Sequence, residues 1–361
     1  MKILYVITST DVGGAEKFLT ELIKVTAKEH IVEVISLNKC GPLAAKMKEN
    51  GARQVWSCDM VHPYKFGVLR ELSRIINRFE PDIIHAFLYR AIQFCRLVCA
   101  GKKYKLICSP HFDMAKRNIL LRGMDRFLSH TDNLCVAESF YTARYLVEKQ
   151  GYRKDKVYFL PNGIDIAKFS PSPAIREKMR KNQEISKKEI VFVCIARLAA
   201  VKDPLTLLKA FLSVYNKNRR IRLFFVGEGT MRPEMENFIK ENKLEKAVFL
   251  VGHQEQVSDY LNMADVFVLP SIEESLPLAL LEAVSVGLPC IVSNAGDMNL
   301  WVEHGKNGFV FKKKDDILLS CLLAELATNK QLRETMAQNS LKKAKEITDP
   351  FTGYQQIYKQ I

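Results

Sequence analysis

The sequence lacks several features that would point to particular classes of protein. No apolar run approaches the roughly 18 residues that a membrane-spanning helix needs, which argues against an integral membrane protein. No Gly-x-Gly-x-x-Gly stretch occurs, so a dinucleotide site is not indicated. No Cys-x-x-Cys pair occurs, and no Asp-x-Asp pair is available to hold a divalent cation.

Cysteine usage indicates a reducing compartment. The nine cysteines are an odd number, and most of them lie in apolar segments, among them Cys108, Cys135, Cys194 and Cys290. We interpret them as reduced core residues of a cytoplasmic protein and not as disulfides or zinc ligands. The apolar residues 1–7 are followed too soon by polar ones for a signal peptide, so we expect a first strand there.

Composition and charge bound the possible functions. Of the 361 residues, 48% are hydrophobic and 26% are charged, as in soluble globular proteins and unlike disordered or collagen-like chains. The 54 Lys and Arg exceed the 40 Asp and Glu, and residues 1–170 hold 27 of the basic side chains against 17 acidic ones. This basic first half suggests an anionic partner, either nucleic acid, a membrane surface or an anionic substrate. Nucleic acid is the weakest of the three, because no basic motif interleaved with aromatic residues appears.

Short apolar segments alternate with turns and amphipathic stretches along the chain. The apolar segments are rich in Val, Ile and Phe without polar alternation, which is typical of parallel strands buried on both faces. A chain of 361 residues with this pattern predicts an α/β protein of two Rossmann-like, doubly wound domains. Helices are expected at 14–29, 64–79, 138–150 and 174–188, and strands at 2–8, 31–37, 82–86, 104–109, 133–137, 157–160, 190–196, 221–227, 248–252, 265–269 and 289–293.

Turn and linker chemistry predicts the domain boundaries. The turn Pro161-Asn162-Gly163-Ile164-Asp165 is followed by a segment rich in Pro and Ser, which favours a first domain at 1–165 and a second at 166–345. Residues 346–361 place aromatic and aliphatic side chains at helical spacing, and we expect this last helix to return to the first domain. Because ligands bind at the carboxyl ends of parallel strands, we expect the ligand in a cleft between the two domains.

Two glycines follow the first expected strand. Gly13 and Gly14 let the backbone approach a ligand, and they open a helix whose N-terminal N–H groups suit a phosphate. An ordinary tight turn is the alternative interpretation.

Two cations follow an expected strand of the second domain. Arg197 and Lys202 lie in the loop between that strand and the next helix. A diphosphate there would be neutralised by a bidentate grip from Arg197 and by the point charge of Lys202. The alternative is a pair of solvated surface cations.

A further strand end carries two glutamates. Glu274 lies in a polar loop before an expected helix, and Pro277 is a residue type favoured in the first turn of such a helix. Glu282 lies within that helix among mostly apolar neighbours. A carboxylate buried there needs donors, which ligand hydroxyls would supply. The backbone N–H groups of Ser275 and Leu276 are available for an anion. A glutamate that forms a salt bridge to a neighbouring helix is the alternative.

Together these motifs resemble the GT-B fold, retaining glycosyltransferases of family 4 (group 1 glycosyltransferases). Each motif alone is weak, but the matches run in order over nearly the whole chain. The matching motifs are the Glu-x7-Glu pair Glu274 and Glu282, the cations Arg197 and Lys202, the loop Gly13-Gly14, the turn 161–165, Val226-Gly227-Glu228-Gly229 and Val251-Gly252-His253. Two places depart from the family pattern: Ala196 stands where Gly is usual before the arginine, and the last helix lacks the usual aromatic-Trp pattern.

The resemblance implies roles for individual residues. Glu282 would hold the ribose hydroxyls of a nucleotide sugar, and Glu274 would contact the hydroxyls of the donor sugar. Arg197 and Lys202 would stabilise the leaving diphosphate. His111, which follows an expected strand, matches the family histidine near the donor sugar, although a lone histidine is more often structural. The remaining implied binding residues are Gly13 and Gly14 beside the phosphate, Gly252 and His253 near the base, Gly227, and the backbone from Ser275 to Leu278 with Leu276.

The resemblance also implies the reaction. A hexosyl or N-acetylhexosaminyl group would pass from a nucleoside-diphosphate sugar, with a UDP-sugar favoured, to a glycan or lipid-linked acceptor in cell-surface polysaccharide or glycoconjugate biosynthesis. No cofactor is expected, and protein cations in place of a metal predict metal independence. A nucleotide-sugar epimerase and a non-catalytic nucleotide-sugar-binding protein are the alternatives, although the intact site motifs argue against both.

The basic side chains of the first domain cluster in one stretch. Residues 96–126 contain eight Lys and Arg and two Asp. One hypothesis is that this face meets anionic lipid head groups or a phosphate-bearing lipid-linked acceptor, which would make the protein peripheral on the cytoplasmic face of a membrane. An ordinary solvated basic face is the alternative.

Overall fold

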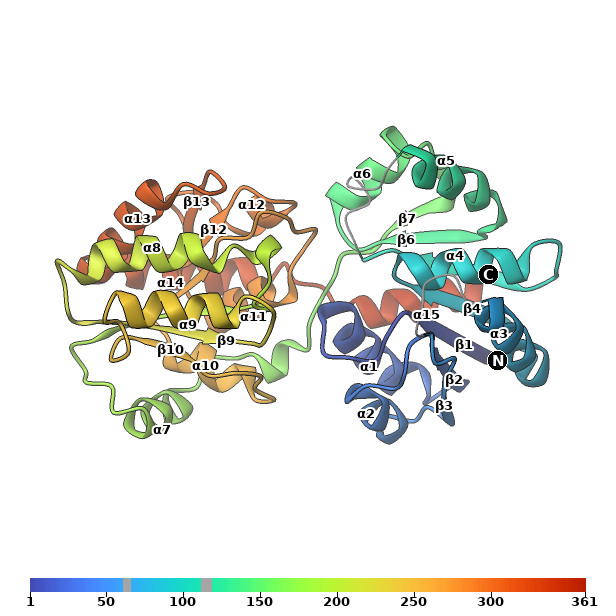
Figure 1. Cartoon of the computed structure of the whole chain (residues 1–361), viewed down its shortest axis with the longest axis horizontal. Coiled ribbons are helices and arrows are strands. Elements are labelled where there is room, and N and C mark those ends of the chain that lie inside the picture. The colour runs from blue at the N-terminus through green and yellow to red at the C-terminus, as the bar shows by residue number, and fades with distance from the viewer. Residues whose placement is uncertain (61–65, 112–118) are drawn as a thin grey trace. The chain divides into compact units, whose positions relative to one another are not determined.

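The computed structural model describes residues 1–60, 66–111 and 119–361 (Figure 1). The chain forms two compact units, Met1–Asn162 with Asp349–Ile361 (unit 1) and Gly163–Thr348 (unit 2). The chain passes from unit 1 to unit 2 after Asn162 and returns to unit 1 after Thr348. Parts of two sequence-based expectations, residues 64–65 of a helix and Lys116 and Arg117 of the basic stretch, lie outside the described residues.

Unit 1 is built on a seven-stranded parallel sheet in the order β3-β2-β1-β4-β5-β6-β7. Its central strands correspond to the mostly apolar runs of the sequence. This is expected because helices cover both faces of the sheet, so side chains on both faces are buried. The edge strand β3 was not expected, since its four residues mix polar and apolar side chains. The strands are β1 Lys2–Ile7, β2 Ile31–Ser36, β3 Gln54–Ser57, β4 Ile83–Phe87, β5 Lys105–Ser109, β6 Leu134–Ala137 and β7 Val157–Phe159.

The helices of unit 1 begin at recognisable capping residues where the sequence offers them. The Ser139 hydroxyl accepts the Thr142 N–H at 2.9 Å at the start of α6, and Asp349 accepts the Phe351 N–H at 3.0 Å at the start of α15. The helices are α1 Gly14–Thr26, α2 Leu43–Glu49, α3 Phe66–Phe79, α4 Tyr89–Cys99, α5 Ile119–Leu128, α6 Phe140–Glu148 and α15 Pro350–Gln360. None of the helices in the described ranges is both long and apolar enough to cross a bilayer.

Unit 2 has a six-stranded parallel sheet in the order β10-β9-β8-β11-β12-β13. Its last edge strand was not expected, because it is a four-residue segment that begins with Gly308. The strands are β8 Ile190–Ile195, β9 Ile221–Val226, β10 Val248–Leu250, β11 Val266–Leu269, β12 Cys290–Ser293 and β13 Gly308–Phe311.

Helices cover both faces of the unit 2 sheet. Figure 1 shows α8 and α9 in front of this sheet and α14 behind it. The helices are α7 Pro173–Asn182, α8 Pro204–Tyr215, α9 Arg232–Glu241, α10 Val257–Met263, α11 Leu278–Val286, α12 Met298–Trp301, α13 Asp316–Thr328 and α14 Lys330–Ala344.

Both sheets reverse their strand order at one point. In unit 1 the reversal lies between β1 and β4, and in unit 2 it lies between β8 and β11. The loops that leave these neighbouring strands diverge to opposite faces of the sheet, which opens a crevice at the carboxyl edge. The topology therefore predicts where each unit receives a ligand.

The last helix is attached to unit 1 through a buried polar network. The hydroxyl of Tyr358 lies 2.7 Å from His85 Nδ1 and 3.2 Å from the hydroxyl of Tyr5, and His85 Nε2 lies 2.8 Å from Ser109 Oγ. Burial lowers the pKa of His85 well below its usual range, so the ring is neutral and one nitrogen must accept while the other donates.

We expect Tyr358→Phe to destabilise unit 1 by about 1–3 kcal/mol, because it leaves a ring nitrogen of buried His85 without its partner. Tyr158→Phe is the matched control, since Tyr158 is 44% exposed and should change stability little. Urea unfolding followed by circular dichroism measures the difference. Equal midpoints for the two variants would show that the hydrogen bond between Tyr358 and His85 contributes nothing to the stability of unit 1.

Candidate active site

Two loops meet at the reversal point of the unit 2 sheet. One follows β8 and carries Arg197 and Lys202, and the other follows β11 and carries Glu274. Because β8 and β11 are neighbours, the loops start side by side, and the Ile272 N–H donates to the Val201 carbonyl at 2.8 Å. Residues more than 70 positions apart in sequence are thereby brought to one place.

An ion pair joins these loops. The ammonium of Lys202 lies 2.5 Å from Oε1 of Glu274, and the hydroxyl of Ser271 donates to the same oxygen at 2.7 Å. The Glu274 side chain is only 8% exposed and that of Lys202 is 22% exposed. Lys202 is therefore not a solvated surface cation, one of the two interpretations that the sequence allowed.

Arg197 differs from Lys202 in its surroundings. Its side chain is exposed and makes no hydrogen bond or ion pair with any residue that the structure describes. A guanidinium in this position can turn toward an anionic ligand without first breaking a contact within the protein.

The glutamate helix differs slightly from the expectation. Helix α11 begins at Leu278, and Pro277 is the capping residue before it instead of a member of the first turn. Glu282 lies one turn into α11 and is half-buried, while Leu276 is buried and Ser275 is half-buried. The first N–H groups of α11 lie directly after the Glu274 loop, where an anion would find unpaired donors.

Glycines allow the loops after β8, β9 and β10 to pack closely. The N–H of Gly227 donates to the carbonyl of Gly252 at 2.8 Å, and the Leu198 N–H donates to the Glu228 carbonyl at 2.9 Å. A Cβ on Gly227 would collide with the carbonyl oxygen of Ala196, and its φ of +142° also favours glycine. His253, which follows Gly252, is exposed at this end of the sheet.

The loop after β12 completes this end of unit 2 and was missed in the sequence. The hydroxyl of Ser293 donates to the Ser271 carbonyl, and the Asp297 N–H donates to the Ser275 carbonyl at 2.9 Å. A Cβ on Gly296 would collide with the carbonyl oxygens of Glu274 and Ser275. The available signal in the sequence was Gly296, which soon follows the strand expected at 289–293. A parallel strand there ends at the same sheet edge as β11, so the loop after it could be expected near the Glu274 loop.

The remaining candidates belong to unit 1. Gly13 caps α1, and a Cβ on Gly14 would meet no atom within 4 Å. His111 follows β5 with a φ of +43°, and its ring packs 5.2 Å from Phe18 and 5.5 Å from Phe87 between ring centroids. Its Nε2 is buried and has no hydrogen-bond partner in residues 1–60, 66–111 and 119–361, and burial lowers the pKa of His111.

The candidates thus fall into two sets. Contacts within unit 2 bring together the loops that carry ten of them, whereas three candidates lie in unit 1. The first set is Arg197, Lys202, Gly227, Gly252, His253, Glu274, Ser275, Leu276, Leu278 and Glu282, and the second is Gly13, Gly14 and His111.

Known proteins of one family resemble this chain. Residues 175–343 match the family described as Glycosyl transferases group 1, and residues 12–168 match Glycosyltransferase Family 4. The UDP-Gal:alpha-D-GlcNAc-diphosphoundecaprenol alpha-1,3-galactosyltransferase of Escherichia coli is 32% identical over 289 residues, which cover 78% of this chain and 69% of that protein. The lipopolysaccharide core biosynthesis glycosyltransferase LpsD of Rhizobium meliloti is 25% identical, with 93% of this chain and 91% of that protein covered.

Among solved structures, HepE of Anabaena in complex with UDP and glucose has the same fold. Its TM-score is 0.88 at 20% sequence identity, and the match covers 100% of this chain and 99% of that chain. Together with the two parallel sheets, this confirms the expected GT-B class. The chain belongs to the group 1 glycosyltransferases of family 4, which use nucleotide sugars as donors.

We expect Gly296→Ala to weaken binding of nucleoside diphosphates, because the added methyl group would push the Glu274 loop away from β12. Gly305→Ala is the matched control: its φ is also positive, at +79°, but its Cβ would meet no atom within 4 Å. The control should lose about 1–2 kcal/mol of stability from left-handed strain and keep its ligand response.

Thermal unfolding with and without UDP, GDP, ADP or TDP measures both effects. If the two variants responded alike to every nucleotide, the loop after β12 would have no part in the site.

Proposed function

We propose that this glycosyltransferase transfers a hexosyl or N-acetylhexosaminyl group from a UDP-sugar, with retention of anomeric configuration, to a glycan or lipid-linked acceptor in cell-surface polysaccharide or glycoconjugate biosynthesis. The proposal rests on the Lys202–Glu274 ion pair at the reversal point of unit 2. The loop that carries Lys202 also carries Arg197, whose exposed side chain has no partner in the described part of the chain. Two cations, one fixed and one able to turn, suit a diphosphate whose sugar leaves during the reaction.

Printed descriptions of similar proteins support a UDP-sugar. The Escherichia coli relative is named for UDP-Gal, and HepE is described in complex with UDP and glucose. Glu282 on α11 would accept hydrogen bonds from the ribose hydroxyls, and Glu274 would accept hydrogen bonds from the hydroxyls of the donor sugar. Glu274 can do so because its hydrogen bonds from Lys202 and Ser271 leave the carboxylate further lone pairs. Gly252 and His253 would lie near the base.

The acceptor is inferred from chemistry and from relatives. The Escherichia coli relative is named for a GlcNAc-diphosphoundecaprenol acceptor, which combines a lipid with a diphosphate. Residues 1–170 carry 27 basic against 17 acidic side chains, a charge balance that suits such an acceptor or an anionic membrane surface. We therefore propose a peripheral location on the cytoplasmic face of a membrane.

The proposed reaction needs positioning and charge stabilisation. The bond between the anomeric carbon and the diphosphate oxygen breaks, and a bond to the acceptor oxygen forms on the same face. The leaving diphosphate takes up the acceptor's proton and gathers negative charge, which Arg197, Lys202 and the N-terminus of α11 would stabilise. His111 would face the donor sugar as a neutral ring. Because the protein supplies the cations, we propose that no metal ion is needed.

The direct test is donor turnover with defined partners. UDP-Gal, UDP-Glc and UDP-GlcNAc are each incubated with the protein and an α-GlcNAc-diphosphoryl lipid, with Mg²⁺ or with EDTA. We expect one donor to yield an α-linked product by NMR at equal rates in both buffers. A β-linked product would contradict retention, EDTA inhibition reversed by Mg²⁺ would contradict metal independence, and donor isomerisation without acceptor would indicate an epimerase.

We expect Arg197→Gln to lower kcat by about 10²–10³-fold, since a charge that meets the developing anion is lost. The thermal midpoint should not change, because the Arg197 side chain is exposed and has no partner in the described part of the chain. Arg220→Gln is the control, since Arg220 is an exposed arginine that precedes β9 at the opposite sheet edge. Equal kcat values for both variants would remove Arg197 from the mechanism.

A further inference from the structure

Two buried carboxylates flank β6 of unit 1, one at each end of the strand. Asp132 lies shortly before β6 and is 2% exposed, and Glu138 directly follows β6 and is 1% exposed. A carboxylate that is removed from water is costly unless hydrogen-bond donors surround it. The two ends of one strand therefore show how this fold treats a buried negative charge in two different places.

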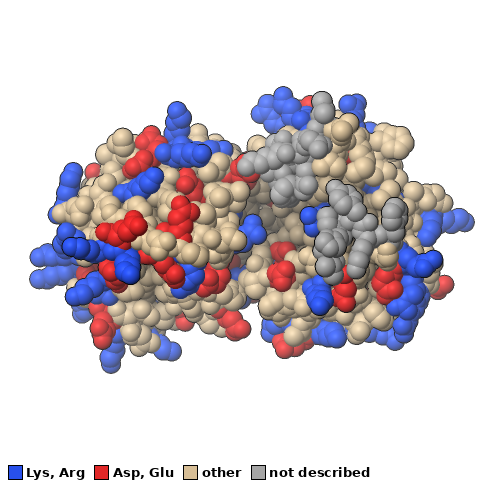
Figure 2. Space-filling view, in the orientation of Figure 1, with Lys and Arg blue, Asp and Glu red and all other residues tan. Residues whose placement is uncertain are grey.

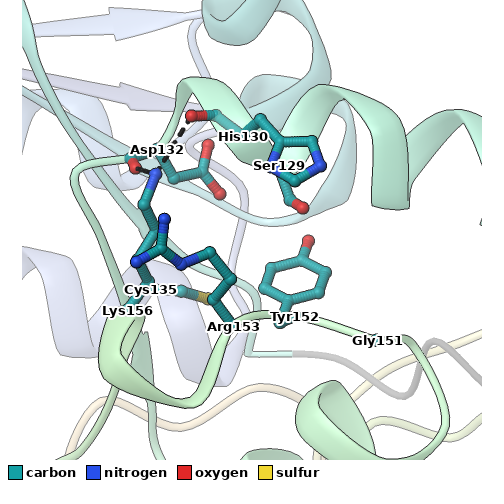
Figure 3. Close-up of a pocket in the computed structure, with 8 residues that line it drawn as sticks. All are labelled: Ser129, His130, Asp132, Cys135, Gly151, Tyr152, Arg153 and Lys156. Atoms are coloured by element: carbon teal, nitrogen blue, oxygen red, sulfur yellow. Dashed lines mark hydrogen bonds between the residues drawn. The ribbon is translucent and has the colours of Figure 1, made fainter.

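Asp132 is compensated within the protein. Arg96 of α4 is fully buried and donates to the two carboxylate oxygens of Asp132 at 2.8 and 2.5 Å. Figure 3 shows Asp132 at a small pocket, where Lys156 donates to the backbone carbonyls of His130 and Asp132. This end of β6 thus has the paired cation that a purely structural buried carboxylate needs.

Glu138 has no such cation. Its Oε1 accepts a hydrogen bond from the Thr142 hydroxyl at 2.9 Å, whereas its Oε2 is buried and has no partner in the ranges that the structure describes. Lys and Arg side chains line the outer and upper margins of unit 1 in Figure 2, and none of the described ones pairs with Glu138. The unsatisfied oxygen therefore needs a hydrogen-bond donor that is not a lysine or an arginine.

A suitable donor stands at the end of the neighbouring strand. Cys108 of β5 pairs with Cys135 of β6 in parallel register, and three residues further along each chain are His111 and Glu138. Neighbouring parallel strands lie about 4.8 Å apart. Side chains at equivalent places just beyond two such strands are within reach of a direct hydrogen bond or of one bridging water.

The ring of His111 has the complementary requirement. It packs between Phe18 and Phe87, and its Nε2 is buried without a partner among the described residues. His111 as a whole is half-buried, and Nδ1 is not one of the buried unpartnered atoms, so Nδ1 is the ring nitrogen that a ligand can reach.

The charges around His111 decide its protonation. Burial lowers the pKa of His111, and the carboxylate of Glu138 acts on this pKa in the opposite direction. The other titratable neighbour is His85, which is itself neutral because burial lowers its pKa. The ring of His111 is therefore neutral, and one of its two nitrogens carries the single proton.

We propose that Glu138 is a positioning residue for His111: its carboxylate accepts a hydrogen bond from the Nε2–H group, directly or through one water, and holds the ring in the tautomer whose Nδ1 is an acceptor. A ligand that faces Nδ1 must then donate a hydrogen bond, which a sugar hydroxyl does and an ionised phosphate does not. The inference deepens the proposed function, because its consequence for the ligand rests on a donor sugar that faces His111.

Nitrogen-15 NMR of the histidine rings, recorded without ligand, tests the assignment. His111→Phe identifies the His111 signals among those of the seven histidines. We expect the parent to carry the proton on Nε2 and Glu138→Gln to carry it on Nδ1, because the Gln oxygen keeps the bond from Thr142 and the Gln amide N–H then faces Nε2. The pKa of His111 should also be lower in Glu138→Gln, since the carboxylate that raises it is removed.

Glu148→Gln is the matched control. Glu148 lies on α6, its side chain is 50% exposed, and it pairs with Arg144, so this variant should keep the tautomer and the pKa of His111. The parent spectrum alone tests the assignment even if Glu138→Gln does not fold: a proton on Nδ1 of His111 in the parent would overturn it. The same tautomer and pKa in the parent and in Glu138→Gln would overturn it as well, and would leave Glu138 a purely structural residue.

Failure of this inference is distinguishable from failure of the proposed function, because the NMR measurement needs neither donor nor acceptor. In the turnover assay, Glu138→Gln should lower kcat/KM about 10–100-fold, since a hydrogen bond to a charged group is lost, and should keep the stabilisation by UDP. A parent with the expected tautomer that turns over none of the UDP-sugars would retain the role of Glu138 and lose the proposed reaction. Turnover by a parent whose His111 carries its proton on Nδ1 would do the reverse.

Discussion

The ion pair between Lys202 and Glu274 is the contact on which the candidate site depends. It exists because β8 and β11 are neighbours at the point where the unit 2 sheet reverses its order, so that two loops distant in sequence leave the sheet side by side. A carboxylate that is 8% exposed would be costly without donors, and Lys202 and Ser271 supply them. The pair therefore fixes both loops, and with them the end of the sheet at which α11 begins, before any ligand binds.

The sequence was sufficient for most of the fold because burial on both faces leaves a local signal. β8 is apolar throughout and β1 is apolar after Lys2, and both were predicted to within a residue of their bounds. β3 and β13 were missed because they are short edge strands, where one face or one side lacks a neighbour and polar residues or glycine are tolerated. The burial of Asp125 on helix α5 could not be predicted either, because its partner Arg96 lies on another helix.

For the candidate site as well, some residues could be identified from local sequence patterns, and others only from contacts between distant segments. Motifs that follow a strand, such as Arg197 and Glu274, could be found because strand ends are visible in the sequence. Ser271 and Gly296 could not be assigned roles, because a hydrogen bond to Glu274 and a close approach between the loops after β11 and β12 exist only in the folded unit. The pairing of Lys202 was open for the same reason: its partner lies 72 residues further along the chain.

The edges of the unit 1 sheet hold both compensated charges and buried polar atoms without partners in the described part of the chain. At the amino edge, Lys156 donates to two carbonyls and Asp132 pairs with Arg96, so buried charge is compensated within the protein. At the carboxyl edge, Thr8 Oγ1, His111 Nε2 and Glu138 Oε2 are buried without hydrogen-bond partners among the described residues, and each costs about 1–3 kcal/mol in that state. These residues directly follow or lie just beyond β1, β5 and β6, at the edge where doubly wound sheets bind ligands. The carboxyl edge thus keeps polar groups whose partners a ligand can supply.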